Sequence, residues 1–330
     1  MYSFFIGCDI SKSTIDIAYI QQGIPNYLGR FRNDISGFKS MISNLKKYGP
    51  EDLSSWFICF ENTGIYSKAL LEWLHSQQIP CKEENAFAIK KSLGIKRGKD
   101  DKADAVAICR YAFEKRDSIK PSQLSNPLII NLKKLLSRRE LLVRQKQSIY
   151  LSLSEQKKTL DPDIKKLFEK QNQDLIHLIT QSIKEVEVAI KELMHKNEEI
   201  QTNYSLAQSV VGIGPVIAAY LIAYTNNFNS FTNSRKFATY IGISPFPNQS
   251  GIKNGRTRVS HMANKKLKAL FSNGTLAALM ADPGLKNYYQ RKINEGKQKG
   301  IVINALKNKL VHRVFAVVKR KQPYVKLNYT

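Results

Sequence analysis

Apolar and polar residues alternate along the first thirty positions and then recur at helical spacing. The segments FFIGCDIS, TIDIAYI and YLGRFRN, within residues 3–32, are typical of three short strands separated by polar turns. The next segment, ISGFKSMISNLKKYG, spaces its apolar residues three and four apart, which predicts a helix that ends at Gly49-Pro50. The chain therefore begins with three strands and a helix.

Strands and helices alternate in the next seventy residues. SSWFICFEN predicts a buried strand that ends in a carboxylate, and GIYSKALLEWLHSQ predicts an amphipathic helix. IPCKEENAFAI then predicts another strand, and DKADAVAICRYAFEK a helix. Three strands, a helix and then alternating strands and helices is the order of a ribonuclease H-like α/β domain, which we place at residues 1–125. Such a fold hosts many activities and does not fix the function by itself.

A long helical arm is expected at residues 126–204. The first helix is basic, and Arg139 and Lys146 interrupt its apolar seam. After a break at Asp161-Pro162, the second helix has apolar residues in a heptad-like repeat with Asn197 in one polar position: Ile176, Ile179, Ile183, Val186, Ile190, Leu193 and Ile200. We expect an antiparallel helical hairpin or coiled coil. The pattern leaves open whether it is a dimerisation arm or a spacer within one molecule.

Residues 205–330 predict a basic, mostly α-helical domain. Its first segment, SVVGIGPVIAAYLIAYT, contains the turn Gly212-x-Gly214 before an apolar helix. In a helix-hairpin-helix, backbone N–H groups of such a turn contact DNA phosphate. A tight turn between packed helices explains the same residues equally well. A loop rich in Gly, Asn, Ser and basic residues follows, and basic amphipathic helices end the chain.

The composition is that of an ordinary globular protein, with 42% hydrophobic and 24% charged residues. We find no apolar run near the ~20 residues that a membrane helix requires, and the N-terminus lacks the basic segment of a signal peptide. The cysteines Cys8, Cys59, Cys81 and Cys109 have no zinc-site spacing, which favours free thiols in a reducing cytosol. We therefore expect a cytoplasmic protein, associated with the nucleoid when active, with no membrane partner.

The formal net charge of +25 is large and uneven. From Ser250 to the end there are 18 Lys and Arg residues against only Asp282 and Glu295, so about two-thirds of the excess lies in the last quarter. Each phosphate that a basic side chain neutralises releases condensed counterions, and this favours binding to nucleic acid. A basic, solvated surface without a partner is the alternative.

Four carboxylates of the first domain are candidate metal ligands. Asp9 and Glu61 stand at the ends of apolar strands, and Asp101 and Asp104 share one face of a helix. The first and fourth strands of a ribonuclease H-like sheet are neighbours, so these side chains can converge. Converging carboxylates need cations, and oxygen ligands suit Mg²⁺, two of which can clamp a phosphate in phosphoryl transfer. Alternatively Asp101, or Asp100, caps the helix and Asp104 is a solvated first-turn charge.

Ser250 is the notable hydroxyl. It lies in PFPNQSGIKNGRTR, where Lys253, Arg256 and Arg258 can bind phosphate. A serine with such cations nearby can attack a DNA phosphate, whereas most Ser-Gly serines bond their own backbone. Lys265 and Lys266 in the following segment are further candidate nucleic-acid contacts, together with the Gly212 and Gly214 turn.

Six collinear segments together resemble the DEDD insertion-sequence transposases, the group that includes Piv-type DNA invertases. They are IGCDISKSTIDIAYI, CFENTGIYSKALLEWL, KDDKADAVAIC, GIGPVIAAYLIA, FATYIGISPFPNQSG and ALFSNGTLAAL. The resemblance runs over nearly the whole chain and is weakest in the helical arm. Ser244 stands where a small apolar residue is expected.

The resemblance implies a function for each part. It implies that residues 1–125 are a RuvC-like domain whose metal-binding acids are Asp9, Glu61, Asp101 and Asp104. It assigns a covalent phosphoserine link with DNA to Ser250. It also implies a structured noncoding bridge RNA that pairs with target and donor DNA, and a tetramer whose active sites combine acids and serine from different protomers. We therefore expect a bridge-RNA-guided serine recombinase that exchanges DNA strands. The alternative is a RuvC-like metal nuclease that hydrolyses branched DNA; a non-enzymatic RNA-binding scaffold is a third possibility.

Overall fold

The computed structural model divides into two compact units, Met1–Leu124 and Ser125–Thr330. It describes residues 2–93, 100–122, 126–156, 161–231, 233–244, 246–250, 253–258 and 263–325. Side chains of residues 93, 153–156, 246–250 and 253–258 are outside this description.

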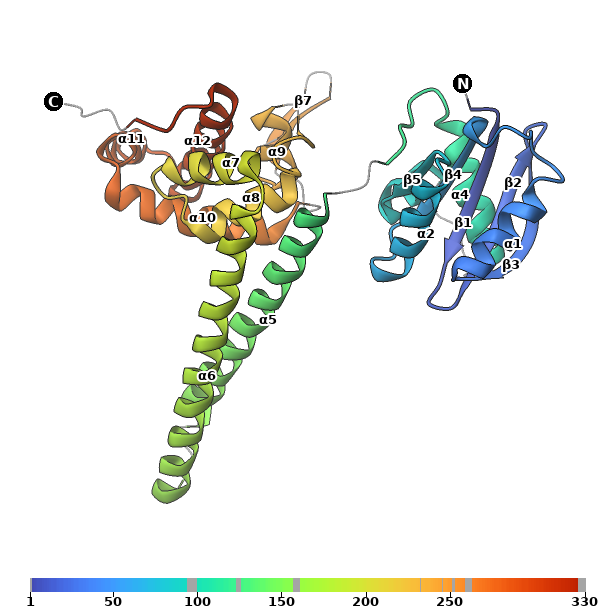
Figure 1. Ribbon diagram of the computed structural model, residues 1–330. Helices are drawn as coiled ribbons and strands as arrows, with labels where there is room; N and C mark the ends of the chain where they lie inside the picture. The colour runs from blue at the N-terminus through green and yellow to red at the C-terminus, as the bar shows by residue number, and fades with distance from the viewer. Residues whose placement is uncertain are drawn as a thin grey trace. The chain divides into compact units, whose positions relative to one another are not determined.

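Unit 1 is built on a five-stranded sheet with the strand order β3-β2-β1-β4-β5 (Figure 1). The strands are β1 (Phe4–Ile10), β2 (Thr14–Gln21), β3 (Ile24–Arg32), β4 (Trp56–Glu61) and β5 (Cys81–Glu84). β1, β2 and β3 pair antiparallel, whereas β4 runs parallel to both β1 and β5. The expected neighbourhood of the first and fourth strands is confirmed, and the mixed sheet agrees with a ribonuclease H-like domain.

Helices cover both faces of this sheet because its strands are apolar on both sides. α1 (Ile35–Leu45) and α2 (Ile65–Ser76) contribute to one core cluster, with strand residues such as Ile6, Ile17 and Ile58. α4 (Asp101–Glu114) and α3 (Ala86–Leu93) pack on the other face, where Phe5 and Phe57 lie. A 3-10 turn, η1 (Leu53–Ser55), precedes β4.

Gly7 brings α4 unusually close to β1. A Cβ atom on Gly7 would lie 2.2 Å from the backbone nitrogen of Cys109 and 2.4 Å from the carbonyl oxygen of Ala105. The thiol of Cys109 donates a hydrogen bond to the carbonyl oxygen of Phe5, at 3.2 Å. Since only glycine leaves room for this contact, Gly7 fixes where α4 crosses the sheet and hence where its first turn lies.

Unit 2 has a long arm of two antiparallel helices, α5 (Pro127–Gln156) and α6 (Pro162–His195) (Figure 1). The polar residues that interrupt the seam of α5 bond across to α6. Arg139 Nε donates to Glu187 Oε1 at 2.7 Å, and Lys146 Nζ donates to Thr180 Oγ1 at 2.7 Å. The arm is thus a helical hairpin, and a regular coiled coil is not established.

The expected continuation of the second arm helix to Ile200 is wrong. α6 ends at His195, and Asn197 caps a new helix, α7 (Glu198–Ser209), by accepting a hydrogen bond from Ile200 N at 3.0 Å. An asparagine at a polar heptad position satisfies free backbone donors better as an N-cap. The chain therefore turns into the helical body of unit 2 one turn earlier than expected.

The body of unit 2 is a helical core that also buries the base of the arm. It comprises α7, α8 (Pro215–Thr225), α9 (Ser234–Tyr240), α10 (Lys265–Ala281), α11 (Pro283–Asn294) and α12 (Lys299–Arg320). Because the arm and these helices share one core, the boundary at residue 204 stays a prediction. In the part of the chain that the structure describes, no helix is long and apolar enough to cross a bilayer.

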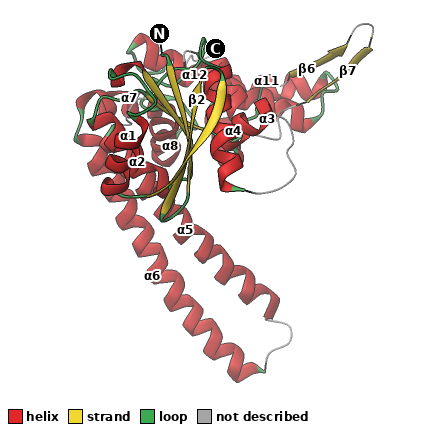
Figure 2. Cartoon of the chain, turned by 90° about the vertical axis from the view of Figure 1, so that its right-hand side faces the viewer, coloured by secondary structure: helices red, strands yellow, loops and turns green. Residues whose placement is uncertain are grey.

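The segment around Ser250, expected to be a loop, forms a two-stranded hairpin. β6 (Phe246–Ser250) pairs antiparallel with β7 (Lys253–Arg258), with Ser250 opposite Lys253. Gly, Asn and Ser are disfavoured in strands, so local propensity alone does not predict this pairing. The hairpin projects from the helices of unit 2 (Figure 2).

Candidate functional site

A row of charged residues crosses the sheet of unit 1 on the face that α4 covers. Asp9 of β1 is paired in register with Asp16 of β2, and Asp16 is paired with Arg30 of β3. On the other side, the parallel ladder of β1 and β4 reaches Cys8 and Phe60, immediately before Asp9 and Glu61. Residues in register point to the same face of a sheet, so the row places Arg30, Asp16, Asp9 and Glu61 side by side.

Asp9 is the carboxylate most affected by this arrangement. Burial, together with the negative charges of Asp104, Asp101 and Glu61, raises the pKa of Asp9 to about 6. Those three are the other acids expected at the site, so the structure brings all four within electrostatic reach of one another. Asp9 and Glu61 are partly buried, whereas Asp101 and Asp104 are exposed.

The first turn of α4 supplies the two acids that come last in the sequence. Asp100 is the N-cap, and its carboxylate accepts a hydrogen bond from Lys102 N at 3.2 Å. This leaves Asp101 and Asp104 in the first turn, where acidic side chains are favoured by the helix dipole. Of the two alternatives for capping, the structure selects Asp100.

Arg30 holds the first turn of α4 to the sheet. Its Nε donates to Asp16 Oδ2 at 2.9 Å, and its Nη2 donates to Asp101 Oδ2 at 2.9 Å. Asp16 is buried, with 3% of its surface exposed, and also accepts a hydrogen bond from Tyr27 Oη at 2.6 Å. Arg30 is therefore a fixed cation between a buried carboxylate and a candidate metal ligand.

The sequence did not single out Asp16 or Arg30, although a signal was present. Asp16 occupies the polar place in TIDIAYI, and its strand is apolar on both sides of it. A buried carboxylate needs a charged partner, but the strand register that provides Arg30 is a long-range property.

Glu84 extends the row of carboxylates to the edge strand β5 of the sheet. The sequence did not single out this residue either. It is paired in register with Glu61 on the parallel strands β4 and β5. Tyr111 Oη of α4 donates to Glu84 Oε2 at 3.1 Å. Glu84 thus holds α4 near its C-terminal end, as Arg30 does at its start.

The carboxylates fit a hard cation, although no three His, Cys, Asp or Glu side chains in the described part of the chain form a preassembled metal group. The ion pair with Arg30 turns the carboxylate of Asp101 toward Arg30, so it does not converge with the other three carboxylates. The oxygen-only donor set suits Mg²⁺. The raised pKa of Asp9 shows that ionising all of these acids without a cation is unfavourable.

Ser250 is the last residue of β6 in unit 2. The backbone register places Lys253 opposite it, and Arg256 and Arg258 lie further along β7. Their side chains are outside the described part of the structure, so their roles stay predictions.

The turn Gly212-x-Gly214 has a clear packing role at its first glycine. Gly212 has a φ of +92°, and a Cβ there would lie 2.3 Å from the carbonyl oxygen of Gly274 in α10. Gly214 instead precedes α8 with open space around it. The tight-turn interpretation accounts for Gly212, while Gly214 keeps its predicted place as a phosphate contact.

The two candidate lysines at the start of α10 differ. Lys265 is exposed. Lys266 forms an ion pair with Glu140 of α5 and lies 4.3 Å from the ring centre of Tyr220. Partial burial of Glu140 opposes its ionisation, but hydrogen bonds from Lys266 and Arg144 outweigh this and hold the pKa of Glu140 below its usual value. Lys266 therefore joins the arm to the helical body, and Lys265 is the better candidate for a phosphate contact.

Two transposase family models match the chain. The model for DEDD transposases of the IS110 type matches residues 6–161, which include all four candidate acids. The model described as "Transposase IS116/IS110/IS902 family" matches residues 204–290, which include Ser250. Together they cover both units.

Relatives of known description agree with these matches. The chain is 26% identical to the pilin gene-inverting protein of Moraxella bovis over 331 residues, with 99% of each chain covered. The transposase of insertion sequence element IS1111A from Coxiella burnetii is 25% identical over 147 residues, which cover 44% of this chain and 39% of that protein.

These comparisons correct one expectation. The name serine recombinase belongs to a different class of enzyme, and the matching models instead describe a DEDD transposase. The chain belongs to the IS110/IS116/IS902 family of DEDD transposases, which are enzymes that act on DNA.

Proposed function

We propose that this transposase exchanges DNA strands by phosphoryl transfer that depends on Mg²⁺ bound by Asp9, Glu61, Asp101 and Asp104. The observation that carries the proposal is the row of acids at the carboxyl ends of β1 and β4, which α4 completes from above. When bound, Mg²⁺ would neutralise charge that develops on the scissile phosphate. The acids hold and orient the cation, and Arg30 releases Asp101 to them.

Ser250 is the proposed nucleophile. Its hydroxyl loses a proton to solvent and its oxygen bonds to phosphorus, while the bond from phosphorus to the 3′ oxygen of the DNA breaks and that oxygen takes up a proton. The product is a 5′-phosphoserine link that conserves the energy of the broken bond for rejoining. Lys253, Arg256 and Arg258 support this step by binding the phosphates around it.

A denaturing gel of labelled DNA tests this mechanism. The protein with Mg²⁺ should yield DNA with covalently attached protein, and Ser250→Ala should abolish that species. Ser244→Ala, in the same segment, is the matched control and should retain it. Full strand transfer by Ser250→Ala would refute the covalent mechanism.

A RuvC-like nuclease is the second candidate, because the same carboxylates could activate water instead. Under this mechanism Ser250→Ala cleaves DNA at the normal rate and no covalent species forms. Asp104→Asn separates both candidates from a mere scaffold, since it should reduce either DNA-processing activity.

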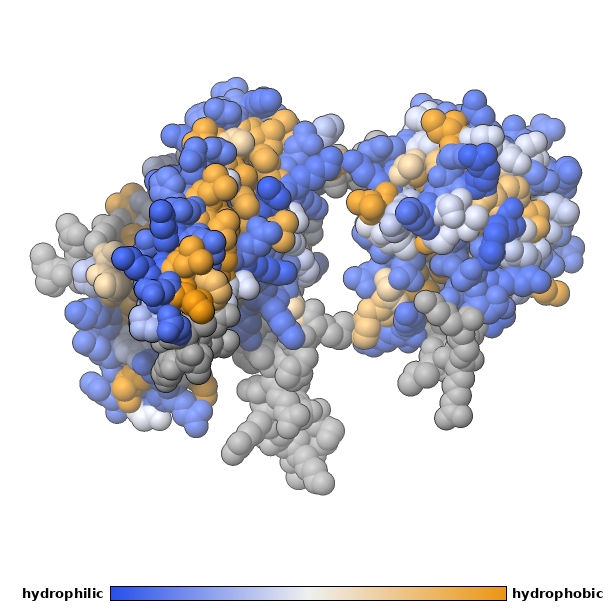
Figure 3. Space-filling model, turned by 90° about the horizontal axis from the view of Figure 1, so that it is seen from below, coloured by the Kyte–Doolittle hydropathy of each residue, from blue (hydrophilic) through white to orange (hydrophobic). Residues whose placement is uncertain are grey.

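We also propose guidance by a structured noncoding RNA and assembly into dimers or tetramers. The excess of positive charge after Ser250 supports a polyanionic partner in addition to duplex DNA. Exposed apolar residues on the arm support assembly: Leu141, Leu151, Ile164, Leu167, Leu175, Leu178 and Val188. Apolar patches also interrupt the hydrophilic surface that Figure 3 shows. RNA guidance predicts that strand transfer requires RNA transcribed beside the gene. Light scattering of the free protein tests assembly into dimers or tetramers.

A further inference from the structure

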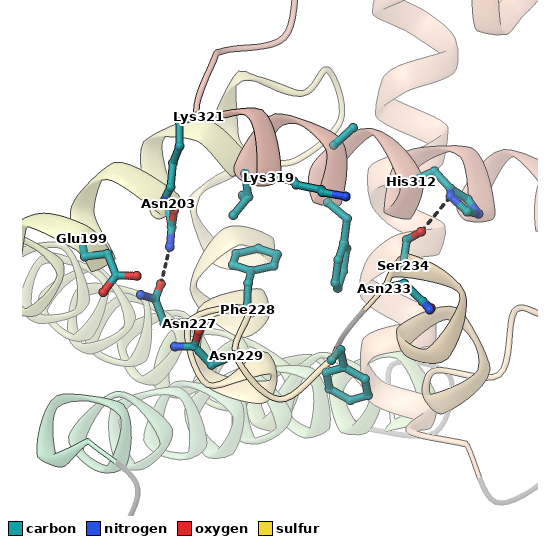
Figure 4. A pocket seen from close by; sticks show the side chains of 14 residues that line it. Glu199, Asn203, Asn227, Phe228, Asn229, Asn233, Ser234, His312, Lys319 and Lys321 are labelled. Atoms are coloured by element: carbon teal, nitrogen blue, oxygen red, sulfur yellow. Dashed lines mark hydrogen bonds between the residues drawn. The ribbon is translucent and has the colours of Figure 1, made fainter.

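The body of unit 2 contains a pocket of about 540 Å³ that the proposed chemistry does not use (Figure 4). Three separate parts of the chain line it: the start of α7, the connection between α8 and α9, and the second half of α12. Its volume is within the range of sites for small organic ligands.

The centre of the pocket is aromatic. Phe228, Phe231 and Phe315 line it, and the rings of Phe228 and Phe315 meet edge to face with their centres 5.2 Å apart. Figure 4 shows Phe228 between two groups of polar side chains. A flat apolar surface with polar groups on either side suits a planar, heterocyclic ligand.

An unusual turn places Phe228 in the pocket. Asn226, Asn227 and Phe228 all have positive φ angles, of 50°, 53° and 65°. Such angles are unfavourable for residues other than glycine and are found preferentially at functional positions. Phe228 N donates to Thr225 Oγ1 at 2.8 Å, and this bond supports the turn.

At one end of the pocket, buried amides form a fixed hydrogen-bonding edge. Asn203 is 2% exposed; its Nδ2 donates to Asn227 Oδ1 at 3.0 Å, and its Oδ1 accepts from Lys321 Nζ at 3.0 Å. Asn227 is 93% buried; its backbone N–H donates to the carbonyl oxygen of Ile222, whereas its side-chain nitrogen Nδ2 takes part in none of the hydrogen bonds among the described residues. Glu199 beside it adds a carboxylate acceptor. This end therefore offers both a donor and an acceptor.

The other end can bind an anion. Ser234 Oγ and His312 Nδ1 are 2.8 Å apart and line the pocket (Figure 4). Lys319 of α12 is exposed and has no ion-pair partner within the described ranges. A hydroxyl, an imidazole and an ammonium group are suitable partners for a phosphate.

We infer that this pocket binds one unpaired nucleotide of a single-stranded nucleic acid. The base would stack on Phe228 with its edge at Asn227 and Glu199, and its phosphate would bind Lys319 and the Ser234–His312 pair. Aromatic stacking with basic side chains beside it is a general mode of binding single strands. Unit 2 would thereby hold a flipped or unpaired nucleotide of the strand that it binds, whether that nucleotide belongs to RNA or to DNA.

Fluorescence anisotropy of labelled tetranucleotides on the full-length protein, in EDTA, tests the inference. A probe with four bases should bind at least about tenfold more tightly than the same probe with one abasic position. Phe228→Leu should remove this difference by weakening only the intact probe. Ribose and deoxyribose versions show whether the nucleotide comes from RNA or DNA.

Lys319→Ala should weaken both probes several-fold, and Lys299→Ala, an exposed lysine at the start of the same helix, should change neither. Lys319→Ala also provides the test if Phe228→Leu fails to fold. Equal affinity for intact and abasic probes, or equal losses in Lys319→Ala and Lys299→Ala, would overturn the inference. Because EDTA prevents cleavage, such a result would leave the proposed strand exchange standing.

Discussion

At the scale of single residues, ionising the carboxyl group of Asp9 costs free energy. Its neighbours in the carboxylate row repel its charge, and its partial burial removes some of the water that would otherwise stabilise it. Such a residue weakens the free protein and gains most when a cation arrives. Stability and function are therefore opposed at this position.

The stability of the metal-free protein should depend on the protonation of Asp9. Its pKa is raised in the folded state to about 6, from an ordinary value of 3.8. Because the folded state then binds the proton more tightly, stability should rise as the pH falls from 7.5 toward 5. Asp9→Asn should lack this rise and melt at a higher temperature than the native chain at pH 7.5. Thermal melts in EDTA check this, and a pH-independent difference between the two proteins would contradict it.

Arg30 should have opposite effects on the free and the metal-bound protein. Arg30→Ala leaves buried Asp16 without its cation, which should lower the melting temperature of the metal-free protein. It also frees Asp101 and adds net negative charge, so the rise in melting temperature with Mg²⁺ should increase. Arg32, on the same strand, pairs at the surface with Asp34, which follows the strand, so Arg32→Ala should show neither effect.

At the scale of elements, the contact between β1 and α4 determines where two of the acids lie. Gly7→Ala would press a methyl group against the backbone of α4, so the helix must shift. We expect a loss of about 1–3 kcal/mol in stability and a larger loss of Mg²⁺ binding, because the first turn of α4 moves. Gly300→Ala, where the added methyl meets no atom within 4 Å, is the control. If Gly7→Ala were destabilised but bound Mg²⁺ normally, the packing of α4 on β1 would not determine the geometry of the metal site.

Most elements could be predicted from their patterns, and each error has its own physical cause. β1, β2 and β4 are nearly continuous apolar runs because both faces of each strand are buried, and Asp9 and Glu61 stand out against them. Asn197 was misassigned because a cap and a polar heptad position look alike in sequence. The hairpin at Ser250 was missed because its pairing, not its composition, makes the strands.

At the scale of the whole molecule, the concentration of positive charge after Ser250 should make DNA binding strongly dependent on salt. The affinity should fall steeply as salt rises, with a slope set by the number of phosphates contacted. Lys265→Ala should reduce that slope by about one. Lys266→Ala should instead lower the melting temperature, because it breaks the pair with Glu140. Filter binding at several salt concentrations, with melts of each variant, distinguishes the two lysines.

The sites differ in how far sequence could predict them. The three candidate acids outside β1 lie at or near the end of a strand or helix, so predicting these strands and helices also located the acids. Arg30 needed the register of three strands, and the pocket in unit 2 combines side chains more than 100 positions apart, such as Glu199 and Lys319. A pattern within one short stretch of sequence cannot predict that such distant residues line one pocket.

The short connection between β1 and β2 limits which mutations copies of this gene can carry. Ser11 and Thr14 bond to each other across it and set which residues of β2 face α4. Deleting one residue there would exchange odd for even positions along β2, so that Ile15 and Ile17 would point where Asp16 now does. Copies of this gene should therefore tolerate many substitutions in the connection but no change of its length by a single codon.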